Sequence, residues 1–326
     1  MGDMNISVPY QLRLTMVDGK NINALTDTKS PQTCYICKRT QKQRRASSVL
    51  PPDVIENYRF GLSTVHAWIR VFEFLLHVAY RLELQNKRLN KREQGEVKAR
   101  KREIQEQFKA RLSPRVDQPR QGFGNTNDEN TARRFFEKSA ESASILGLDE
   151  GVIKRFRVIL KTLSSKFDID VDNFGEYARE TKEVVQDRYG WFGLTPTLHK
   201  ILDHGGNVIR NRPVPIGVLT EEAQEARHKE CRYFRLNNAR KTSREENVFD
   251  LYSMLMILSD PLVNSFRDVV ETKGRSVDEE VTDLLLSGSS RDIRCHPEES
   301  EQHSDSEYSD ADSADSRQDA IDSSCE

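Results

Sequence analysis

TCYICKRTQKQRR (residues 33–45) places two cysteines three positions apart and follows them with a run of basic residues. A lone C-x-x-C pair is compatible with half of a metal site, a redox motif or two unrelated small residues. The redox interpretation fails, because the pair does not open a helix after a clear βαβ unit. The segment LHKILDHGG (residues 198–206) adds two histidines, and C-x2-C with H-x4-H is spacing typical of a tetrahedral zinc site. The four expected Zn²⁺ ligands are Cys34, Cys37, His199 and His204.

The distance between the two pairs makes this site unlike a small zinc finger. Because 161 residues separate Cys37 from His199, the ion would tie an early part of the chain to a late one. Five residues of a regular helix rotate by about 140°, so an unbroken helix could not aim both rings at one ion. We expect a helix over 196–204 that stops at Gly205-Gly206 and unwinds in its last turn. The alternative is a helix with two ordinary histidines, one of them favourable at the C-terminus.

The hydrophobic pattern around these motifs predicts mostly helices. Residues 8–18 alternate and indicate a strand, whereas 65–79 carry apolar residues at three- and four-residue steps, as in an amphipathic helix. Residues 87–112 hold ten bases and four acids, which indicates a solvated helix that Pro114 ends or a nuclear-targeting segment. A polar loop is expected at 121–130, with a helix after it. Further helices are expected over 150–165, 173–189, 219–241 (capped by Thr220) and 247–270.

The charges divide into a basic body and an acidic end. From Glu298 to Glu326 there are eleven acids and one base, which leaves 41 acids and 49 bases in residues 1–297. This asymmetry indicates a polyanionic partner and a Ser-rich disordered tail, beginning at 288, that could compete for it. Five cysteines in 326 residues do not form a disulfide framework, so a reducing compartment is expected. We expect no secretion signal and no membrane span.

Carboxylates at two places are candidates for a catalytic site. Asp18 follows the predicted strand, and Glu222 and Glu225 share one helix face by their i, i+3 spacing. The structural alternative is a turn aspartate and two helix-initiating glutamates that interact with the helix dipole.

Basic residues indicate a nucleic-acid surface in two segments. A loop precedes one pair of arginines, and a later run of bases includes two aromatic residues and no acid. Such groups bind phosphate backbones, although a solvated surface is the alternative. The candidates are Arg133, Arg134, Arg232, Arg235, Arg240 and Lys241.

These motifs together resemble the C-terminal half of the catalytic core of Transib-type transposases and the related V(D)J recombination-activating protein. The resemblance runs from about residue 10 to 260 in order. LRLTMVDGK resembles the strand with the family's second catalytic aspartate, and CYIC and LHKILDH resemble its zinc cysteines and histidines. NDENTARRFF resembles a segment that approaches DNA. IGVLTEEAQEARHKECRYFRLNNARK resembles the helix with the catalytic glutamate.

The resemblance implies an RNase H-like recombinase whose acidic triad holds two Mg²⁺ or Mn²⁺ ions. It assigns catalytic roles to Asp18 and Glu225, with Glu222 as a substitute because of a one-residue shift. The family's first aspartate has no counterpart here, so we expect two of three carboxylates and no autonomous strand cleavage. It also implies double-stranded DNA as partner, action in pairs of chains and a nuclear location, with no small-molecule substrate.

The expected fold is α+β and mostly helical: a partial RNase H-like strand region, a large zinc-closed helical insertion and a disordered acidic tail. The expected divisions are 1–50, 51–195, 196–287 and 288–326. A non-enzymatic, zinc-stabilised helical module that binds DNA or protein is the main alternative. A helical scaffold without nucleic acid is the third.

Overall fold

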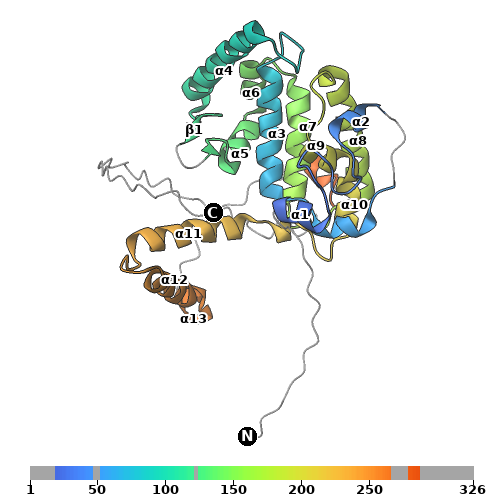
Figure 1. Ribbon diagram of the computed structural model, residues 1–326. Helices are drawn as coiled ribbons and strands as arrows, with labels where there is room; N and C mark the ends of the chain where they lie inside the picture. Colours follow the sequence, from blue (N-terminus) through green and yellow to red (C-terminus); the bar gives the residue numbers. More distant parts are fainter. Residues whose placement is uncertain (1–18, 47–51, 121–123, 266–277, 287–326) are drawn as a thin grey trace, which may run out of the picture.

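The computed structural model describes residues 19–46, 52–120, 124–265 and 278–286, and helices dominate these ranges. Two long helices, α3 (Thr64–Ala79) and α7 (Glu150–Ser164), stand side by side at the centre of Figure 1. α4 (Lys91–Leu112), α5 (Glu129–Glu137) and α6 (Ser139–Leu146) cover one side of this pair. The mostly helical class is therefore confirmed.

The other side of the central pair carries shorter elements around α8 (Val171–Tyr189). They are α1 (Gly19–Leu25), α2 (Gln41–Ala46), the 3₁₀ helix η1 (Ile55–Phe60), α9 (Pro196–His199), η2 (Lys200–His204), α10 (Gly205–Arg210) and the 3₁₀ helix η3 (Ile216–Leu219). The predicted strand at 8–18 lies outside the described residues. Within the described ranges, the only strands are the paired β1 (Pro119–Arg120) and β2 (Gly124–Asn125). The structure thus shows no RNase H-like strand region in these ranges.

The core is built on α3, whose apolar residues recur with the helical period. Ser63 caps the helix, accepting a hydrogen bond from the backbone N–H of His66, and Phe72, Leu75 and Leu76 are fully buried. The ring centroids of Phe72 and Phe135 are 4.9 Å apart, which joins α3 to α5. The predicted apolar stripe over 65–79 is confirmed.

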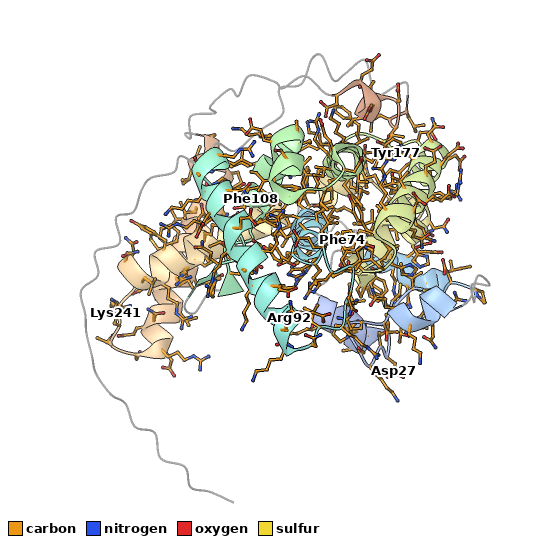
Figure 2. The ribbon with its side chains drawn as sticks, turned by 90° about the horizontal axis from the view of Figure 1, so that it is seen from above. Asp27, Phe74, Arg92, Phe108, Tyr177 and Lys241 are labelled. Carbon is orange, nitrogen blue, oxygen red and sulfur yellow. The ribbon has the colours of Figure 1, made fainter. Side chains whose placement is uncertain are left out.

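Helix α4 contributes few residues to the core. Asn90 and Glu93 form a capping box at its start, and only Ile104 and Phe108 are buried along it. Figure 2 shows α4 crossing the outside of the body. The predicted solvated helix and its end before Pro114 are both confirmed.

A helical arm leaves the body after η3. It consists of α11 (Glu222–Asn237), α12 (Arg244–Ser259) and α13 (Pro261–Ser265), below the body in Figure 1. The N-cap of α11 is Glu221, one residue after the predicted Thr220, whose hydroxyl lies 3.0 Å from that of Thr64. The expected helix over 247–270 begins three residues earlier, where Ser243 caps α12, and is broken at Pro261.

The chain is attached to the body again by residues 278–286, which include α14 (Glu279–Thr282). Leu285 forms an antiparallel bridge with Ile169, and Asp278 pairs with Arg157 and Lys161 of α7 at 2.6 and 3.0 Å. The arm is therefore attached to the body on both sides. No helix among the described residues has the length and apolar character needed to cross a membrane.

Candidate metal centre

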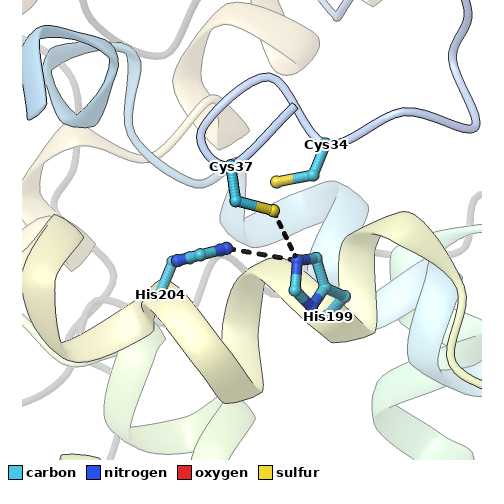
Figure 3. Close-up of side chains that lie close together, drawn as sticks. All are labelled: Cys34, Cys37, His199 and His204. Atoms are coloured by element: carbon cyan, nitrogen blue, oxygen red, sulfur yellow. Dashed lines mark hydrogen bonds between the residues drawn. The ribbon is translucent and has the colours of Figure 1, made fainter. Parts of the chain in front are cut away.

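Four side chains from two segments that are far apart in the sequence meet in the interior of the helical body. One donor atom from each of them lies within 4.8 Å of the other three, and all four residues are buried. Cys37 Sγ is 3.2 Å from His199 Nε2, which is 3.1 Å from His204 Nε2 (Figure 3). The four are Cys34, Cys37, His199 and His204, as the sequence predicted.

A tight turn presents the two cysteines. The Cys34 N–H donates to the Arg39 carbonyl and the Lys38 N–H to the Cys34 carbonyl, and a bridge between Thr33 and Thr40 closes the turn. Lys38 adopts a positive φ of 57°, which turns the chain back immediately after Cys37. Both sulfurs therefore point to the same side.

The residues between the cysteines anchor this turn to the body. The Tyr35 hydroxyl donates to the Gly61 carbonyl at 2.6 Å, and Asn57 Nδ2 donates to the Tyr35 carbonyl at 2.7 Å. Ile36 is fully buried. The cysteine pair is thus held from the η1 side by hydrogen bonds that do not involve the cysteine side chains.

A π-helical turn presents the two histidines. In η2 the backbone hydrogen bonds join residues five apart rather than four, so His199 and His204 come to one side of the helix. The expectation that the helix stops at Gly205-Gly206 is wrong, because it continues through α10 to Arg210. The two glycines instead allow close packing on α8: a Cβ on Gly205 would lie 3.0 Å from the Phe174 ring.

Two carboxylates orient the imidazole rings. His199 Nδ1 lies 2.7 Å from Asp203 Oδ2, and His204 Nδ1 lies 2.9 Å from Asp53 Oδ2. A ring that donates from Nδ1 to its carboxylate has Nε2 directed at the cluster, where this nitrogen can bind a metal ion once its proton is lost. Carboxylates in this position are the usual supporting partners of metal-bound histidines.

Neither supporting carboxylate was predicted. Asp203 lies four residues after His199, so its helical spacing carried a usable signal. Asp53 is 151 residues from His204 in the sequence, and no local pattern could connect them.

The electrostatics of the cluster favour negative charge on the sulfur of Cys37 but not on that of Cys34. Hydrogen bonds from Cys34 and from both histidines lower the pKa of Cys37 to about 2, although burial acts in the opposite direction. The same hydrogen bond with Cys37, together with burial, raises the pKa of Cys34. Burial lowers the pKa of His204, but Cys37 and Asp53 outweigh it and raise that pKa. Without a metal, the cluster therefore retains protons that an incoming cation must displace.

The donor set fits a tetrahedral divalent ion. Donors about 2.0 to 2.3 Å from a common centre lie roughly 3.3 to 3.8 Å from one another. Here two donor pairs are 3.1 and 3.2 Å apart, and all four donors lie within 4.8 Å of one another. The four donors account for a full tetrahedral shell. The buried group can therefore hold a metal ion, and its arrangement resembles a closed site more than one with an open position for substrate.

The structure does not test whether the predicted catalytic carboxylates come together. Asp18 lies outside the described residues, and Glu222 and Glu225 are placed only by their backbone in α11. The Mg²⁺ site therefore remains a prediction.

At least three of the predicted DNA-binding residues are engaged within the protein. Arg133 forms an ion pair with Glu129 at 2.6 Å and lies over the Trp68 ring, and Arg240 forms ion pairs with Asp250 and Glu246. The Arg235 guanidinium donates to Asn247 at 3.2 Å, Arg134 and Lys241 are exposed, and Arg232 lies along α11. Figure 2 shows Lys241 at the outer end of the arm. These residues lie on two separate parts of the molecule.

No protein-family model matches the chain, and no curated protein is detectably similar to it.

Proposed function

We propose that the four-residue cluster binds Zn²⁺ and acts as a structural clamp. The supporting observation is the meeting of two thiols and two imidazoles inside the protein, with a carboxylate behind each ring. Thiolate and imidazole donors in a four-coordinate site favour zinc over Mg²⁺ or Ca²⁺, which prefer oxygen. When bound, the ion would hold the cysteine turn against η2.

The clamp can be tested by metal content and by stability. Purified protein should contain one zinc per chain, and Cys37→Ser should lose it. A chelator should lower the midpoint of thermal unfolding of the wild type and leave that of the zinc-free variant unchanged. Cys231, outside the cluster, supplies the matched control substitution Cys231→Ser.

We also propose that this clamp belongs to a DNA recombinase core of the Transib type, which binds duplex DNA in the nucleus. The proposal draws on the order of the sequence motifs, and the convergence of the predicted zinc ligands agrees with it. Asp18 and Glu225, with Glu222 as a substitute, would hold Mg²⁺ or Mn²⁺ in such a core. We expect the 326-residue polypeptide, assayed alone, to bind duplex DNA without cutting it.

Duplex binding and strand cleavage are separate measurements. Fluorescence anisotropy at low salt should detect a labelled duplex, with affinity that falls as salt rises. Incubation with supercoiled DNA and Mg²⁺ should leave the DNA intact. Nicking that survives both Asp18→Ala and Glu225→Ala would show that the carboxylates are wrongly assigned. Absence of duplex binding at low salt would favour the helical scaffold.

The arm favours a second candidate, a protein-binding module. Nine of its large apolar side chains are between 37% and 67% exposed, and none of the described residues of α12 is buried. They are Tyr233, Leu236, Val248, Phe249, Tyr252, Met256, Ile257, Leu262 and Val263. A helix with this pattern normally packs against another element.

We propose that these exposed apolar side chains of the arm pack against a second copy of the chain. At about 150 to 250 Å² per aromatic side chain, the three rings alone leave roughly 300 Å² exposed. With the six aliphatic side chains the surface approaches the roughly 800 Å² that each partner buries in a standard interface. Light scattering should give twice the chain mass at micromolar concentration, and Phe249→Glu should give the monomer. A monomeric wild type would remove this candidate.

A further inference from the structure

The cations of helix α4 fall into two groups, which differ in their position around the helix axis and in whether they have a partner. At about 100° per residue, positions 7, 11 and 18 after Lys91 lie within about 20° of it around the helix axis. These positions are Lys98, Arg102 and Lys109, and all four side chains are exposed. With a rise of about 1.5 Å per residue, this cationic stripe is about 27 Å long.

The stripe residues have no partner among the described residues, whereas the other cations of α4 do. Lys91, Lys98, Arg102 and Lys109 form no hydrogen bond or ion pair with any residue in the described ranges. The remaining four cations are held by neighbours: Arg92 by Glu96, Arg100 by Glu103, Lys101 by Asp117 and Arg111 by Ser144. The free charges are therefore gathered on one line of the helix surface.

The surroundings of the stripe suit an elongated anion. A concavity of about 360 Å³ lies beside Lys98 and Arg102 and includes the side chains of Gln105 and Gln118. Its only carboxylate, Asp117, is paired with Lys101 at 2.6 Å. Of the acids of α4, only Glu106 falls within about 60° of the stripe, and the others lie more than 100° away.

Gly95 lies next to the stripe, between Lys91 and Lys98. A Cβ added there would meet nothing within 4 Å, so packing within the described chain does not require glycine. Glycine inside an exposed helix is unfavourable relative to alanine. The missing side chain does, however, allow a partner to approach the helix backbone closely.

We propose that the α4 stripe is a docking surface for the phosphate backbone of duplex DNA. At about 3.4 Å per base pair, its length corresponds to about eight base pairs, and four cations would neutralise up to four phosphates. This inference rests on the proposed duplex binding and assigns it to a helix other than those of the arm and of the metal cluster. The contacts read no base sequence, because they are made to phosphates.

The test compares two double variants of the full chain that carry the same net charge. Lys98→Gln with Arg102→Gln removes two stripe charges, and Arg92→Gln with Arg111→Gln removes two exposed, partnered charges from the same helix. Binding to a duplex of about 20 base pairs is measured by anisotropy between about 50 and 200 mM KCl. Circular dichroism and thermal melts establish that both variants are folded.

The stripe variant should bind about tenfold or more weakly at 0.1 M salt, and its slope of log K against log salt should fall by about 1.8. The control variant should remain within about twofold of the wild type. Glu106→Gln should bind more tightly, and Gly95→Ala should bind more weakly while its melting midpoint rises. Opposite changes in binding and stability would identify close approach to the helix rather than a folding defect.

Three outcomes separate the possible failures. If the wild type does not bind duplex at low salt, both the proposed function and this inference are wrong. If the wild type binds duplex, but the stripe variant and the control variant lose the same amount of affinity or none, only the stripe assignment is wrong. If a peptide of residues 298–326, with eleven acids, binds the wild type and loses affinity for the stripe variant while duplex affinity is unchanged, the stripe serves the acidic segment instead.

Discussion

Replacing Asp203 by asparagine should weaken zinc binding without changing any of the four metal ligands. The Asp203 carboxylate lies 2.7 Å from His199 Nδ1 and 2.5 Å from Lys182 Nζ, and its side chain is only 8% exposed. Although burial acts in the opposite direction, these two partners lower the pKa of Asp203, so the group is an anion at neutral pH. Asparagine keeps the shape of the side chain and removes that charge.

The magnitude follows from the role of the carboxylate behind the ring. It fixes the His199 tautomer and makes Nε2 a stronger donor, and loss of such a partner costs about 10- to 100-fold in metal affinity. This corresponds to about 1.4 to 2.7 kcal/mol. Zinc affinity is measured by competition with a chromophoric chelator at fixed pH, wild type against Asp203→Asn.

Two control variants isolate the effect. Lys182→Gln removes the same ion pair but leaves the carboxylate on His199, and Asp172→Asn alters an exposed carboxylate elsewhere on α8. Both should remain within about threefold of the wild type, since neither touches a ring. The reasoning is refuted if Asp203→Asn binds zinc as tightly as the wild type, or if Lys182→Gln is weakened to the same extent.

Three further predictions concern the core, the metal and the returning segment. Phe72→Ala should lower the free energy of unfolding by about 3 to 5 kcal/mol in denaturant titrations, because it removes a fully buried ring. Zinc affinity should rise from pH 5 to 7 in chelator competition, because the metal must displace the proton that the hydrogen bond with Cys37 and burial keep on Cys34. Partial burial raises the pKa of Asp278, but the hydrogen bonds from Arg157 and Lys161 outweigh it and lower that pKa. These ion pairs therefore stabilise the folded protein above about pH 4, and this contribution is lost on further acidification. Asp278→Asn should therefore flatten the acid side of the stability profile measured by thermal melts.

The parts of the structure that the sequence predicted are those specified by local periodicity. The three- and four-residue steps of apolar residues located α3, and the paired cysteine and histidine spacings identified, across 161 residues, the four side chains that meet in the candidate metal centre. The π-helical turn could not be predicted, because a regular helix sets residues five apart on different sides. The start of α11 was predicted one residue early, at Thr220 rather than Glu221, and the contact between the hydroxyls of Thr220 and Thr64 is tertiary, so no local pattern contains it.

X-ray absorption at the zinc edge of the purified full chain, with the metal content measured on the same sample, tests the central claim most directly. The account predicts one zinc per chain, surrounded by two sulfurs at about 2.3 Å and two nitrogens at about 2.0 to 2.1 Å, with one sulfur lost in Cys37→Ser. A folded chain that contains no zinc, or a zinc shell made mainly of oxygen, would contradict it.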